Sequence, residues 1–189
     1  MSTIPKIGIV VGTTRPGRVG RTVGEWVLKL VASRSDAEFE LVDVADFDLP
    51  LFDEPVPPSI STGYIHEHTR RWASAISSFD GFLFVTGEYN HSVPSSLTNA
   101  LSYLAREWND KAAGLIGYGS VGGSRAIEHL RGILAELQVA TVRNTAMFGL
   151  LTDFENYTEF KPAAFQADAV QAVAEQTVTW ARALRTVRD

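Results

Sequence analysis

The segment from Gly12 to Thr22 combines residue types that suit a phosphate group. Its glycines permit tight backbone turns, and its threonine hydroxyls can donate hydrogen bonds together with the amides of a following helix. It also carries three arginines (Arg15, Arg18 and Arg21), whose guanidinium groups match phosphate oxygens in a two-pronged contact. The sequence therefore predicts a phosphate site here, in preference to a solvated basic turn.

Two well-known phosphate motifs do not fit this segment. Gly12 and Gly17 have the spacing of the nucleoside triphosphatase loop, but Arg18 and Val19 stand where that loop needs a lysine and a serine or threonine. The segment also lacks the G-x-G-x-x-G of a dinucleotide-binding first turn. A nucleoside triphosphatase is therefore disfavoured.

A second polar segment, Thr86 to Pro94, brings a glycine, a carboxylate, an aromatic ring and an amide close together. A flat polar ring could lie against this backbone, although a turn without a ligand would use the same residue types. Asn99, farther along, interrupts the apolar face of a predicted helix. We expect it to make a local hydrogen bond rather than to contact a ligand.

The third segment, Gly117 to Ser124, does contain G-x-G-x-x-G. However, Val142 stands where a nicotinamide-binding fold needs an acidic residue, so the motif is a weak indication of a nicotinamide site. Its glycines fit better as a rim that lets the backbone approach a ligand closely.

Two other chemistries fail on spacing. A serine hydrolase needs a glycine two residues before its nucleophile, but Tyr118 stands at that position relative to Ser120. It also needs a histidine late in the chain, but the last histidine is His129. His66 and His68 have no third metal ligand near them, so we interpret them as solvated helix residues and predict no metal site.

The elements that must position these segments begin with five predicted strands. Short apolar runs, typical of parallel strands covered on both faces, occur at 7–11, 82–85 and 112–116. Residues 39–44 alternate as an edge strand does, and 139–142 is a weaker fifth candidate.

Helices are predicted between these strands. Apolar stripes with a spacing of three to four residues indicate helices at 23–31, 65–79, 97–104 and 130–137, and an alanine-rich stretch over 163–184 indicates a fifth. The regular alternation of strand and helix predicts a doubly wound α/β sheet with right-handed crossovers. Ligands bind to such sheets at the carboxyl ends of the strands, which is where the three segments lie.

Composition bounds the partners. The chain has 189 residues, 45% of them hydrophobic, which is typical of one globular domain. Seventeen basic and 22 acidic residues leave a net charge of −5, so we expect no nucleic-acid or membrane-surface binding. The absence of cysteine excludes disulfides, thiolate nucleophiles and cysteine-based metal sites. No apolar run approaches the roughly 20 residues of a membrane helix, and we expect a cytoplasmic protein.

Together the three segments resemble the NADPH-dependent FMN reductase family, in order and spacing, from Lys6 to about Leu150. The family's first-loop pattern resembles Gly12-Thr13-Thr14-Arg15 and Gly20-Arg21-Thr22. Its P-E-Y-N-x-S-x-P pattern resembles Gly87-Glu88-Tyr89-Asn90-His91-Ser92-Val93-Pro94, which is the most specific match. Leu49-Pro50-Leu51-Phe52-Asp53-Glu54-Pro55 resembles a segment that lies near the family's subunit interface, and Tyr118-Gly119-Ser120-Val121-Gly122-Gly123 resembles its third loop.

The resemblance implies a flavodoxin-like domain over residues 1–189, with a five-stranded parallel sheet in the order 2-1-3-4-5 and helices on both faces. It also implies that FMN is bound by three groups of residues. The first loop would supply Thr13, Thr14, Arg15, Arg18, Gly20, Arg21 and Thr22. The second would supply Gly87, Glu88, Tyr89 and Asn90, and the third Tyr118, Gly119, Ser120, Gly122 and Gly123.

This sequence departs from the family pattern at three positions. Gly87 replaces a proline, which loosens the turn against the flavin ring. Gly20 replaces a serine and Thr22 an asparagine among the phosphate ligands, so arginines or backbone amides must supply some of the phosphate contacts.

The predicted function is an oxidoreductase in which NADPH, or NADH, reduces bound FMN and a quinone, free flavin, azo compound or metal ion then takes the electrons. Because the flavin carries this chemistry, no catalytic protein residue is predicted. The alternatives are a flavodoxin-like electron carrier without NAD(P)H turnover and a phosphate-ester enzyme on the same fold.

A homodimer or homotetramer is expected, because flavin sites in the family are completed by a neighbouring subunit. The apolar residues Leu49, Leu51 and Phe52 on an exposed loop, and Trp108 at a helix end, are compatible with an interface.

Overall fold

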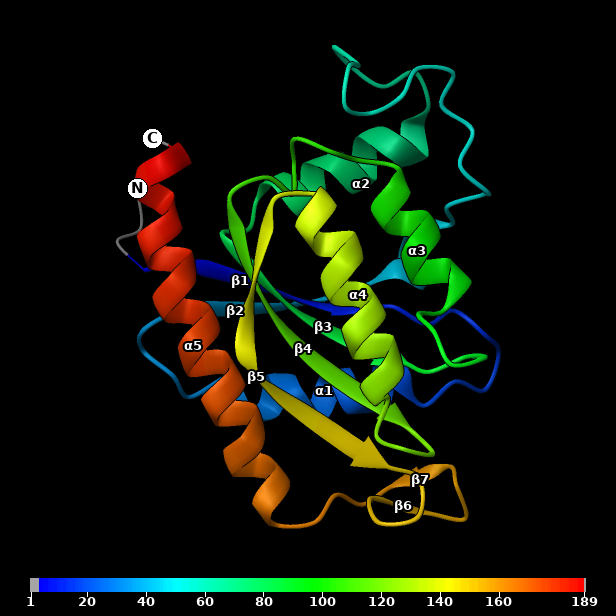
Figure 1. Ribbon diagram of the computed structural model, residues 1–189, viewed down its shortest axis with the longest axis vertical. Helices are drawn as coiled ribbons and strands as arrows, with labels where there is room; N and C mark the ends of the chain where they lie inside the picture. Colours follow the sequence, from blue (N-terminus) through cyan, green and yellow to red (C-terminus); the bar gives the residue numbers. More distant parts are fainter. Residues whose placement is uncertain (1–3, 189) are drawn as a thin grey trace.

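The structure is a computed structural model that describes residues 4–188, and its centre is one parallel sheet (Figure 1). The five strands of this sheet are β1 (Lys6–Val11), β2 (Glu38–Asp43), β3 (Gly81–Gly87), β4 (Lys111–Gly119) and β5 (Val139–Gly149). They lie in the order β2-β1-β3-β4-β5, and every neighbouring pair is parallel. The predicted strand order is therefore confirmed.

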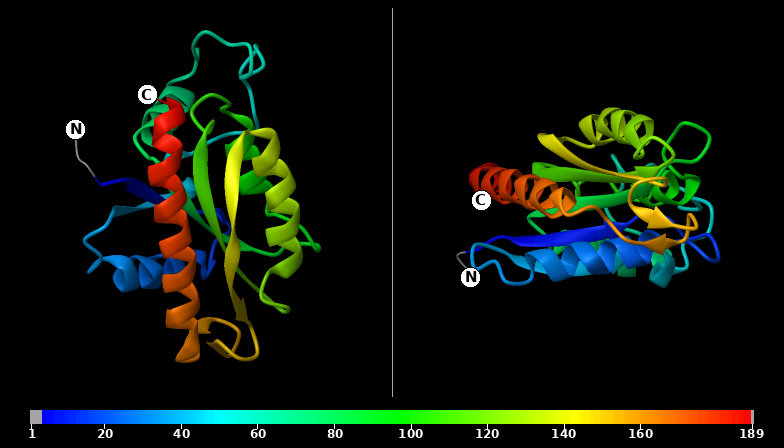
Figure 2. Two further views of the ribbon diagram at one scale, coloured as in Figure 1. Left: turned by 60° about the vertical axis from the view of Figure 1, so that its left-hand side comes forward. Right: turned by 90° about the horizontal axis from the view of Figure 1, so that it is seen from below.

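Five α-helices and one short 3-10 helix surround the sheet. They are α1 (Gly20–Val31), η1 (Val44–Phe47), α2 (Glu67–Ser77), α3 (Ser95–Ser102), α4 (Ser124–Glu136) and α5 (Phe165–Arg188). Helices α1 and α5 cover one face of the sheet, and α2, α3 and α4 cover the other. The left-hand view of Figure 2 shows β5 between α5 and α4. The apolar side chains of both sheet faces are thereby removed from water, which stabilises the three layers.

The burial of each strand follows from its position. Every residue of the central strands β3 and β4 is buried, as their continuous apolar runs predict. The edge strand β2 alternates between exposed and half-buried residues before it ends in a buried pair. Strand β5 is longer than predicted, because the pairing with β4 shifts between Ala113 and Leu115 and then resumes as far as Gly149.

The loop after η1 explains where α2 begins. We expected Ile65 on the apolar face of this helix, but α2 begins at Glu67, and 62% of Ile65 is exposed. The buried carboxylate of Glu54 accepts hydrogen bonds from the backbone amides of Ile65 (3.1 Å) and His66 (3.0 Å). A carboxylate in this position satisfies amides that the first turn of a helix leaves free, and it therefore fixes the start of α2.

One expected interface residue lies in the core instead. Trp108 is fully buried and packs against the rings of Trp72, Phe82 and Phe84, so it cannot contribute to a subunit interface. Leu51 remains exposed on the loop after η1. Among residues 4–188, no helix is long and apolar enough to cross a membrane.

The chain also forms a small hairpin that the sequence analysis missed. Strands β6 (Phe154–Glu155) and β7 (Glu159–Phe160) pair in antiparallel fashion at the end of β5, before α5 begins. Phe160 contacts both Trp26 of α1 and Phe148 of β5 with edge-to-face rings. The hairpin is thus packed onto the edge of the sheet that holds the loops.

The far end of α5 is attached to the sheet by partly buried ion pairs. The Asp80 carboxylate accepts hydrogen bonds from Arg185 (2.9 and 2.7 Å), from Arg188 (2.7 Å) and from the Lys6 amide (2.8 Å). Burial would raise the pKa of Asp80, but the hydrogen bonds from Arg185 and Lys6 outweigh it and lower that pKa. The pair therefore contributes stability above the unfolded pKa of about 3.9, and this stability is lost as the pH falls through the lower folded value.

We expect Asp80→Asn to lower the free energy of unfolding by about 2 kcal/mol at pH 7, because it removes the carboxylate charge that faces two partly buried guanidinium groups. The difference from the unmodified protein should shrink below about pH 4. Urea denaturation at several pH values measures both effects. Glu67→Gln, which breaks an exposed pair with Arg70 on α2, is the control and should change stability by less than about 0.5 kcal/mol. Equal losses in the two variants would contradict the assignment.

Candidate functional site

The three predicted loops meet at the carboxyl edge of the sheet. Loop A (residues 12–19) follows β1, loop B (88–94) follows β3 and loop C (120–123) follows β4; these strands are adjacent in the sheet. Strand order reverses between β1 and β3, which is where doubly wound folds bind ligands. Loops A and B, together with the end of β4, bound a cavity of about 160 Å³, here called the loop pocket, whose remaining wall is the segment after β5.

The loop pocket gathers part of the predicted site. Six of the sixteen predicted residues line it, namely Arg15, Arg18, Glu88, Tyr89, Tyr118 and Gly119. The other lining residues are Gly17 and Val19 of loop A, together with Leu150, Tyr157 and Thr158. The last three come from the segment after β5, which sequence reasoning did not connect with the site.

Two of the three arginines are held by acidic residues at the end of β2. Asp43, whose side chain is only 1% exposed, accepts hydrogen bonds from Arg18 (2.6 Å) and Arg21 (3.1 Å). Arg21 also pairs with Glu25 (3.1 Å), and it lies outside the loop pocket. Arg15, in contrast, is exposed, and among residues 4–188 its side chain donates only a long 3.4 Å hydrogen bond to the Pro16 carbonyl.

Loop A nevertheless has free donors for an anion. The Nε atom of Arg18 is buried without a hydrogen-bond partner, although its Nη2 is bound to Asp43. Helix α1 begins at Gly20 with no side-chain cap and no acidic residue in its first turn, so its N-terminal amides keep their partial positive charge. An orphaned guanidinium nitrogen and an uncapped helix start fit a phosphate group, and this part of the FMN site therefore suits its expected ligand.

A buried hydroxyl pair explains the glycine at position 20. The hydroxyls of Thr13 and Tyr118 are 2.9 Å apart and both residues are buried. A Cβ atom on Gly20 would lie 2.4 Å from Thr13 Oγ1 and 2.7 Å from the Tyr118 hydroxyl. Burial raises the pKa of Tyr118 to about 12, so its hydroxyl stays protonated and can donate a hydrogen bond at neutral pH. The space that the family gives to a serine side chain is thus occupied by Tyr118 and Thr13 here.

Loop B is a tight turn that is fixed at both sides. Asn90 and His91 both have positive φ (50° and 65°), and the backbones of Tyr89 and Ser92 exchange two 3.0 Å hydrogen bonds across them. This is the geometry of a two-residue hairpin turn. The hydroxyl of Ser92 lies 2.9 Å from Nδ1 of His129 on α4, which ties the turn to the neighbouring helix.

Glu88 lines the loop pocket, but its carboxylate holds loop B against α4. Its carboxylate pairs with Arg125, accepting hydrogen bonds from Nε (2.7 Å) and from the backbone amide (3.1 Å). Burial would raise the pKa of Glu88, but Arg125 outweighs it and lowers that pKa, so the carboxylate stays ionised. Glu88 therefore positions the backbone of Tyr89, which lies between the loop pocket and a neighbouring groove of about 560 Å³ along α3.

The glycines of loop C serve the backbone. Gly122 and Gly123 have φ near +70°, and a Cβ atom on Gly123 would lie 2.7 Å from the Tyr118 amide nitrogen. A Cβ on Gly87 would lie 3.2 Å from the Tyr118 ring, so the glycine that replaces the family's proline also accommodates this tyrosine. Ser120 is exposed beside them, and the loop pocket is lined by Tyr118 and Gly119 at the end of β4 rather than by residues 120–123.

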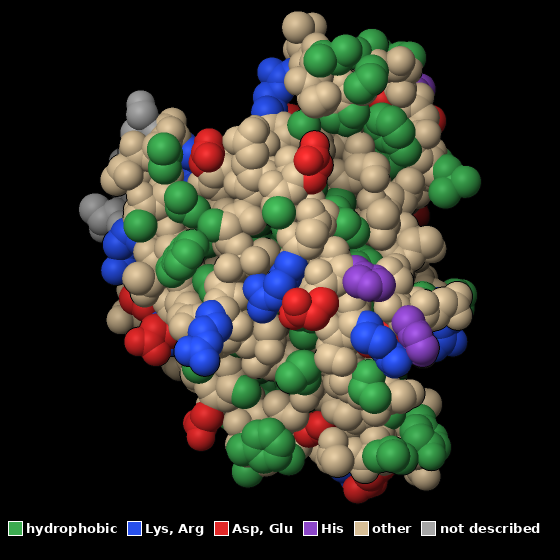
Figure 3. All heavy atoms as spheres, in the orientation of Figure 1, with side chains coloured by type: hydrophobic (Ala, Val, Ile, Leu, Met, Phe, Trp, Pro, Cys, Tyr) green, Lys and Arg blue, Asp and Glu red, His purple; other side chains and the backbone are tan. Residues whose placement is uncertain are grey.

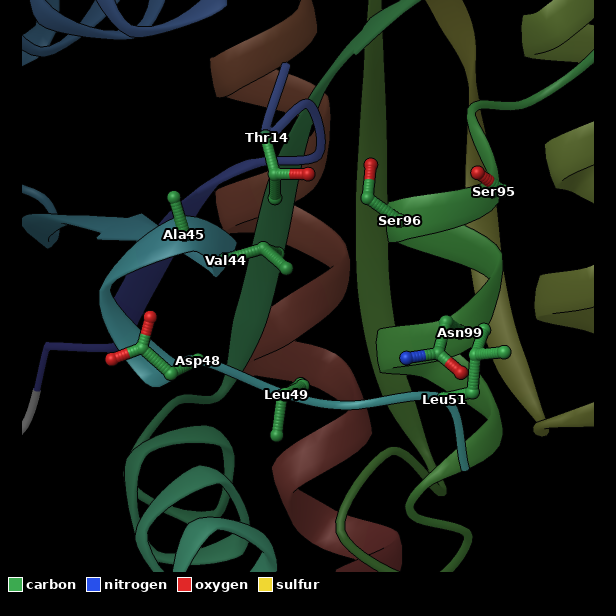
Figure 4. Close-up of a pocket in the computed structure, with 9 residues that line it drawn as sticks. All are labelled: Thr14, Val44, Ala45, Asp48, Leu49, Leu51, Ser95, Ser96 and Asn99. Atoms are coloured by element: carbon green, nitrogen blue, oxygen red, sulfur yellow. The ribbon is translucent and has the colours of Figure 1, made fainter. Parts of the chain in front are cut away.

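The remaining predicted residues lie around the loop pocket. Thr22 is exposed on α1, and Asn90 lines the groove along α3 rather than the loop pocket. Thr14 points into a third hollow of about 480 Å³ between loop A, η1 and α3, where Figure 4 shows it opposite Ser96. Asn99 borders that hollow. Its side chain donates to the Pro50 carbonyl (2.6 Å) and accepts from the Phe52 amide (2.9 Å), so its hydrogen bonds go to the distant loop after η1 and are not local as expected.

His66, at the N-cap of α2, and His68, in its first turn, stay apart from the three loops. The rings of His66 and His68 stack 5.2 Å apart, and His68 lies 3.0 Å from the Asp53 carboxylate. No group of three potential metal-binding side chains occurs among residues 4–188.

A parallel sheet in this order, with an uncapped first helix and a glycine-rich rim at its switch point, defines a flavodoxin-like protein that binds a phosphorylated ligand. Comparison with known proteins gives the particular family. The profile of the NADPH-dependent FMN reductases matches residues 5–153, and the chain belongs to this family.

Related proteins agree with this assignment. The chain is 36% identical, over 78% of each sequence, to an NAD(P)H-dependent FMN reductase of Nectria sp. It is 31% identical to a 2-hydroxy-1,4-benzoquinone reductase of Burkholderia sp, over 76% of this chain and 77% of that protein. The flavoenzyme FerB, an NAD(P)H:acceptor oxidoreductase of Paracoccus denitrificans, has the same fold, with a TM-score of 0.72, 20% identity and coverage of 94% and 97%.

The predicted family, fold and type of enzyme are therefore confirmed. The chain is an oxidoreductase of the FMN- and NAD(P)H-dependent kind, and this function is favoured over an electron carrier without NAD(P)H turnover.

Proposed function

We propose that this protein transfers two electrons from NADPH or NADH, through FMN bound at the loop pocket, to a quinone. The balanced reaction is NAD(P)H + H⁺ + quinone → NAD(P)⁺ + hydroquinone. The observation that carries the assignment to this edge is the orphaned Arg18 Nε beside the uncapped start of α1, which is an unsatisfied anion site at the switch point of the sheet. A quinone is preferred as acceptor because the related Burkholderia protein is a benzoquinone reductase.

In this proposal loop A binds the phosphate of FMN. Arg15 supplies an exposed guanidinium, Arg18 its buried Nε, and α1 its N-terminal amides. Thr13 fixes loop A through its buried hydrogen bond with Tyr118, and Gly20 leaves room for that contact. Arg21 stays with its acidic partners on the surface of α1.

Loops B and C form the wall for the flavin ring. Their backbones are open to a flat ligand near Tyr89 and Gly119, while Glu88 and its partner Arg125 keep loop B in position. The loop pocket is smaller than the roughly 300 Å³ of a typical small-molecule site, so the ring would extend along Tyr89 into the groove beside α3. FMN supplies the hydride chemistry, and the protein binds, orients and shields it.

We further propose that residues 1–189 act as one domain, as a homodimer or homotetramer in the cytoplasm. The support for an oligomer is the exposed apolar surface on the loop after η1, where Leu51 is 84% and Ile60 72% exposed.

Initial-rate kinetics test the proposed reaction. With NADPH and 1,4-benzoquinone varied together, double-reciprocal plots should be parallel, because the oxidised nicotinamide leaves before the quinone binds. The rate should depend on added FMN after the cofactor has been stripped. Benzoquinone reduction that proceeds equally without FMN would contradict the proposal.

A further inference from the structure

The β6–β7 hairpin contributes an aromatic wall to the loop pocket. Tyr157, at its tip, lines the pocket together with Tyr89 and Tyr118, although it is about 40 residues from loop C in the sequence. It is 62% exposed, whereas Tyr118 is almost fully buried. The family profile matches as far as residue 153, so Tyr157 lies beyond the matched residues.

The backbone of Tyr157 is unfavourable for a tyrosine. Asn156 and Tyr157 both have positive φ (49° and 60°) in a turn that is closed by a 3.1 Å hydrogen bond from the Thr158 amide to the Glu155 carbonyl. Such turns prefer Asn-Gly, so the asparagine fits and the tyrosine stands where a glycine would be less strained. Strain of this kind is found where a side chain is needed in one particular place.

The base of the hairpin is rigid enough to hold that side chain. Asp153, which is 1% exposed, accepts hydrogen bonds from the amides of Gly149 (2.9 Å) and Ala163 (2.9 Å) and from Gln166 (3.2 and 3.3 Å). The rings of Phe154 and Phe160 lie 5.0 Å apart across the two strands. The exposed Tyr157 therefore lies on a turn whose base is held by several hydrogen bonds and ring contacts.

The hairpin adjoins the ring side of the proposed flavin site. The Leu150 amide donates a 3.0 Å hydrogen bond to the Gly119 carbonyl at the end of β4. The ring centroids of Phe154 and Tyr118 lie 6.4 Å apart. Figure 3 shows apolar side chains gathered on the surface at this end of the molecule. An apolar, aromatic wall here fits a flat ring and does not fit a phosphate.

From this we infer that Tyr157 is a flavin-binding residue: its ring packs against the isoalloxazine, so the turn accepts an unfavourable backbone conformation to present it. The inference rests on the proposed function, since it requires FMN in the loop pocket. It adds a fourth wall, from the end of β5, to the three loops.

Binding of FMN and of riboflavin to the stripped full-length protein, measured by flavin fluorescence, tests this inference. Tyr157→Ala should weaken the binding of both flavins by about tenfold, because both carry the same isoalloxazine ring. Tyr157→Phe should bind both within about threefold of the unmodified protein. Leu151→Ala, on the same segment but outside the loop pocket, is the matched control and should change neither affinity.

Tyr157→Gly separates the binding role from a structural one. It should relieve the backbone strain and raise Tm by roughly 2–4 °C while binding both flavins about tenfold more weakly. Affinities within twofold for Tyr157→Ala, or weaker binding of FMN alone, would overturn the inference. If the unmodified protein bound neither flavin, the proposed function would fail instead, so the two failures are distinguishable.

Discussion

Arg15→Ala should weaken FMN binding by about 10- to 100-fold without changing Tm. A charge-assisted contact to phosphate contributes roughly 1.5–3 kcal/mol, and Arg15 is the loop A arginine that no carboxylate pairs with among the described residues. Because its side chain is exposed and makes one long hydrogen bond, its removal costs the free protein little. Isothermal titration of the stripped protein with FMN measures the affinity.

Arg21→Ala is the control for this prediction. It removes an arginine of the same region, but one whose side chain pairs with Glu25, Asp43 and Asp46 rather than facing the loop pocket. We expect its FMN affinity to stay within about threefold. Riboflavin, which lacks the phosphate, should bind equally to both variants. Loss of FMN binding in Arg21→Ala, with none in Arg15→Ala, would show that the phosphate lies on the outer side of α1.

Gly20→Ser should weaken FMN binding by about tenfold, although serine is the residue that the family pattern has at this position. Its Cβ atom would lie 2.4 Å from Thr13 Oγ1 and 2.7 Å from the Tyr118 hydroxyl, so either the start of α1 or loop A must move. Overpacking of a buried position costs roughly 1–3 kcal/mol, so Tm should fall as well. Flavin fluorescence and thermal denaturation measure the two effects.

The hydroxyl pair can be removed to test this explanation. In a Thr13→Ala, Tyr118→Phe background both close contacts disappear, and adding Gly20→Ser there should cost much less stability than in the unmodified protein. Tighter FMN binding by the single Gly20→Ser variant would contradict the idea that Tyr118 and Thr13 have taken the place of the serine.

The strand runs and the positions of the loops could be predicted from the sequence because they depend on local patterns. Continuous apolar residues in β3 and β4 and alternation in β2 correspond directly to burial in the structure. Since the carboxyl ends of parallel strands share one edge, loops A, B and C had to meet. The family resemblance added the strand order and the cofactor.

The partners of individual side chains could not be predicted, because they depend on contacts between distant parts of the chain. Asp43, at the end of a different strand, forms ion pairs with Arg18 and Arg21, and Arg125 forms an ion pair with Glu88. From the sequence, Arg18, Arg21 and Glu88 were all expected to be as available to a ligand as Arg15.

Trp108 and Tyr157 show two ways in which contacts between distant parts of the chain escape prediction from the sequence. Trp108 looked like an interface residue because it stands at a predicted helix end, but it is buried by the aromatic rings around it. Tyr157 gave no signal, because a tyrosine at positive φ is not a recognised turn residue. Only the folded arrangement brings it to the loop pocket.

The central claim is that this chain binds FMN at the carboxyl edge of its sheet and reduces it with NAD(P)H. The most direct test is the visible absorption spectrum of the protein after reconstitution with FMN and desalting, followed by anaerobic addition of NADPH. We expect flavin bands that survive desalting and bleach when NADPH is added. Flavin bands that survive desalting but are bleached by neither NADPH nor NADH would indicate an electron carrier. A protein that is colourless after desalting would contradict the account altogether.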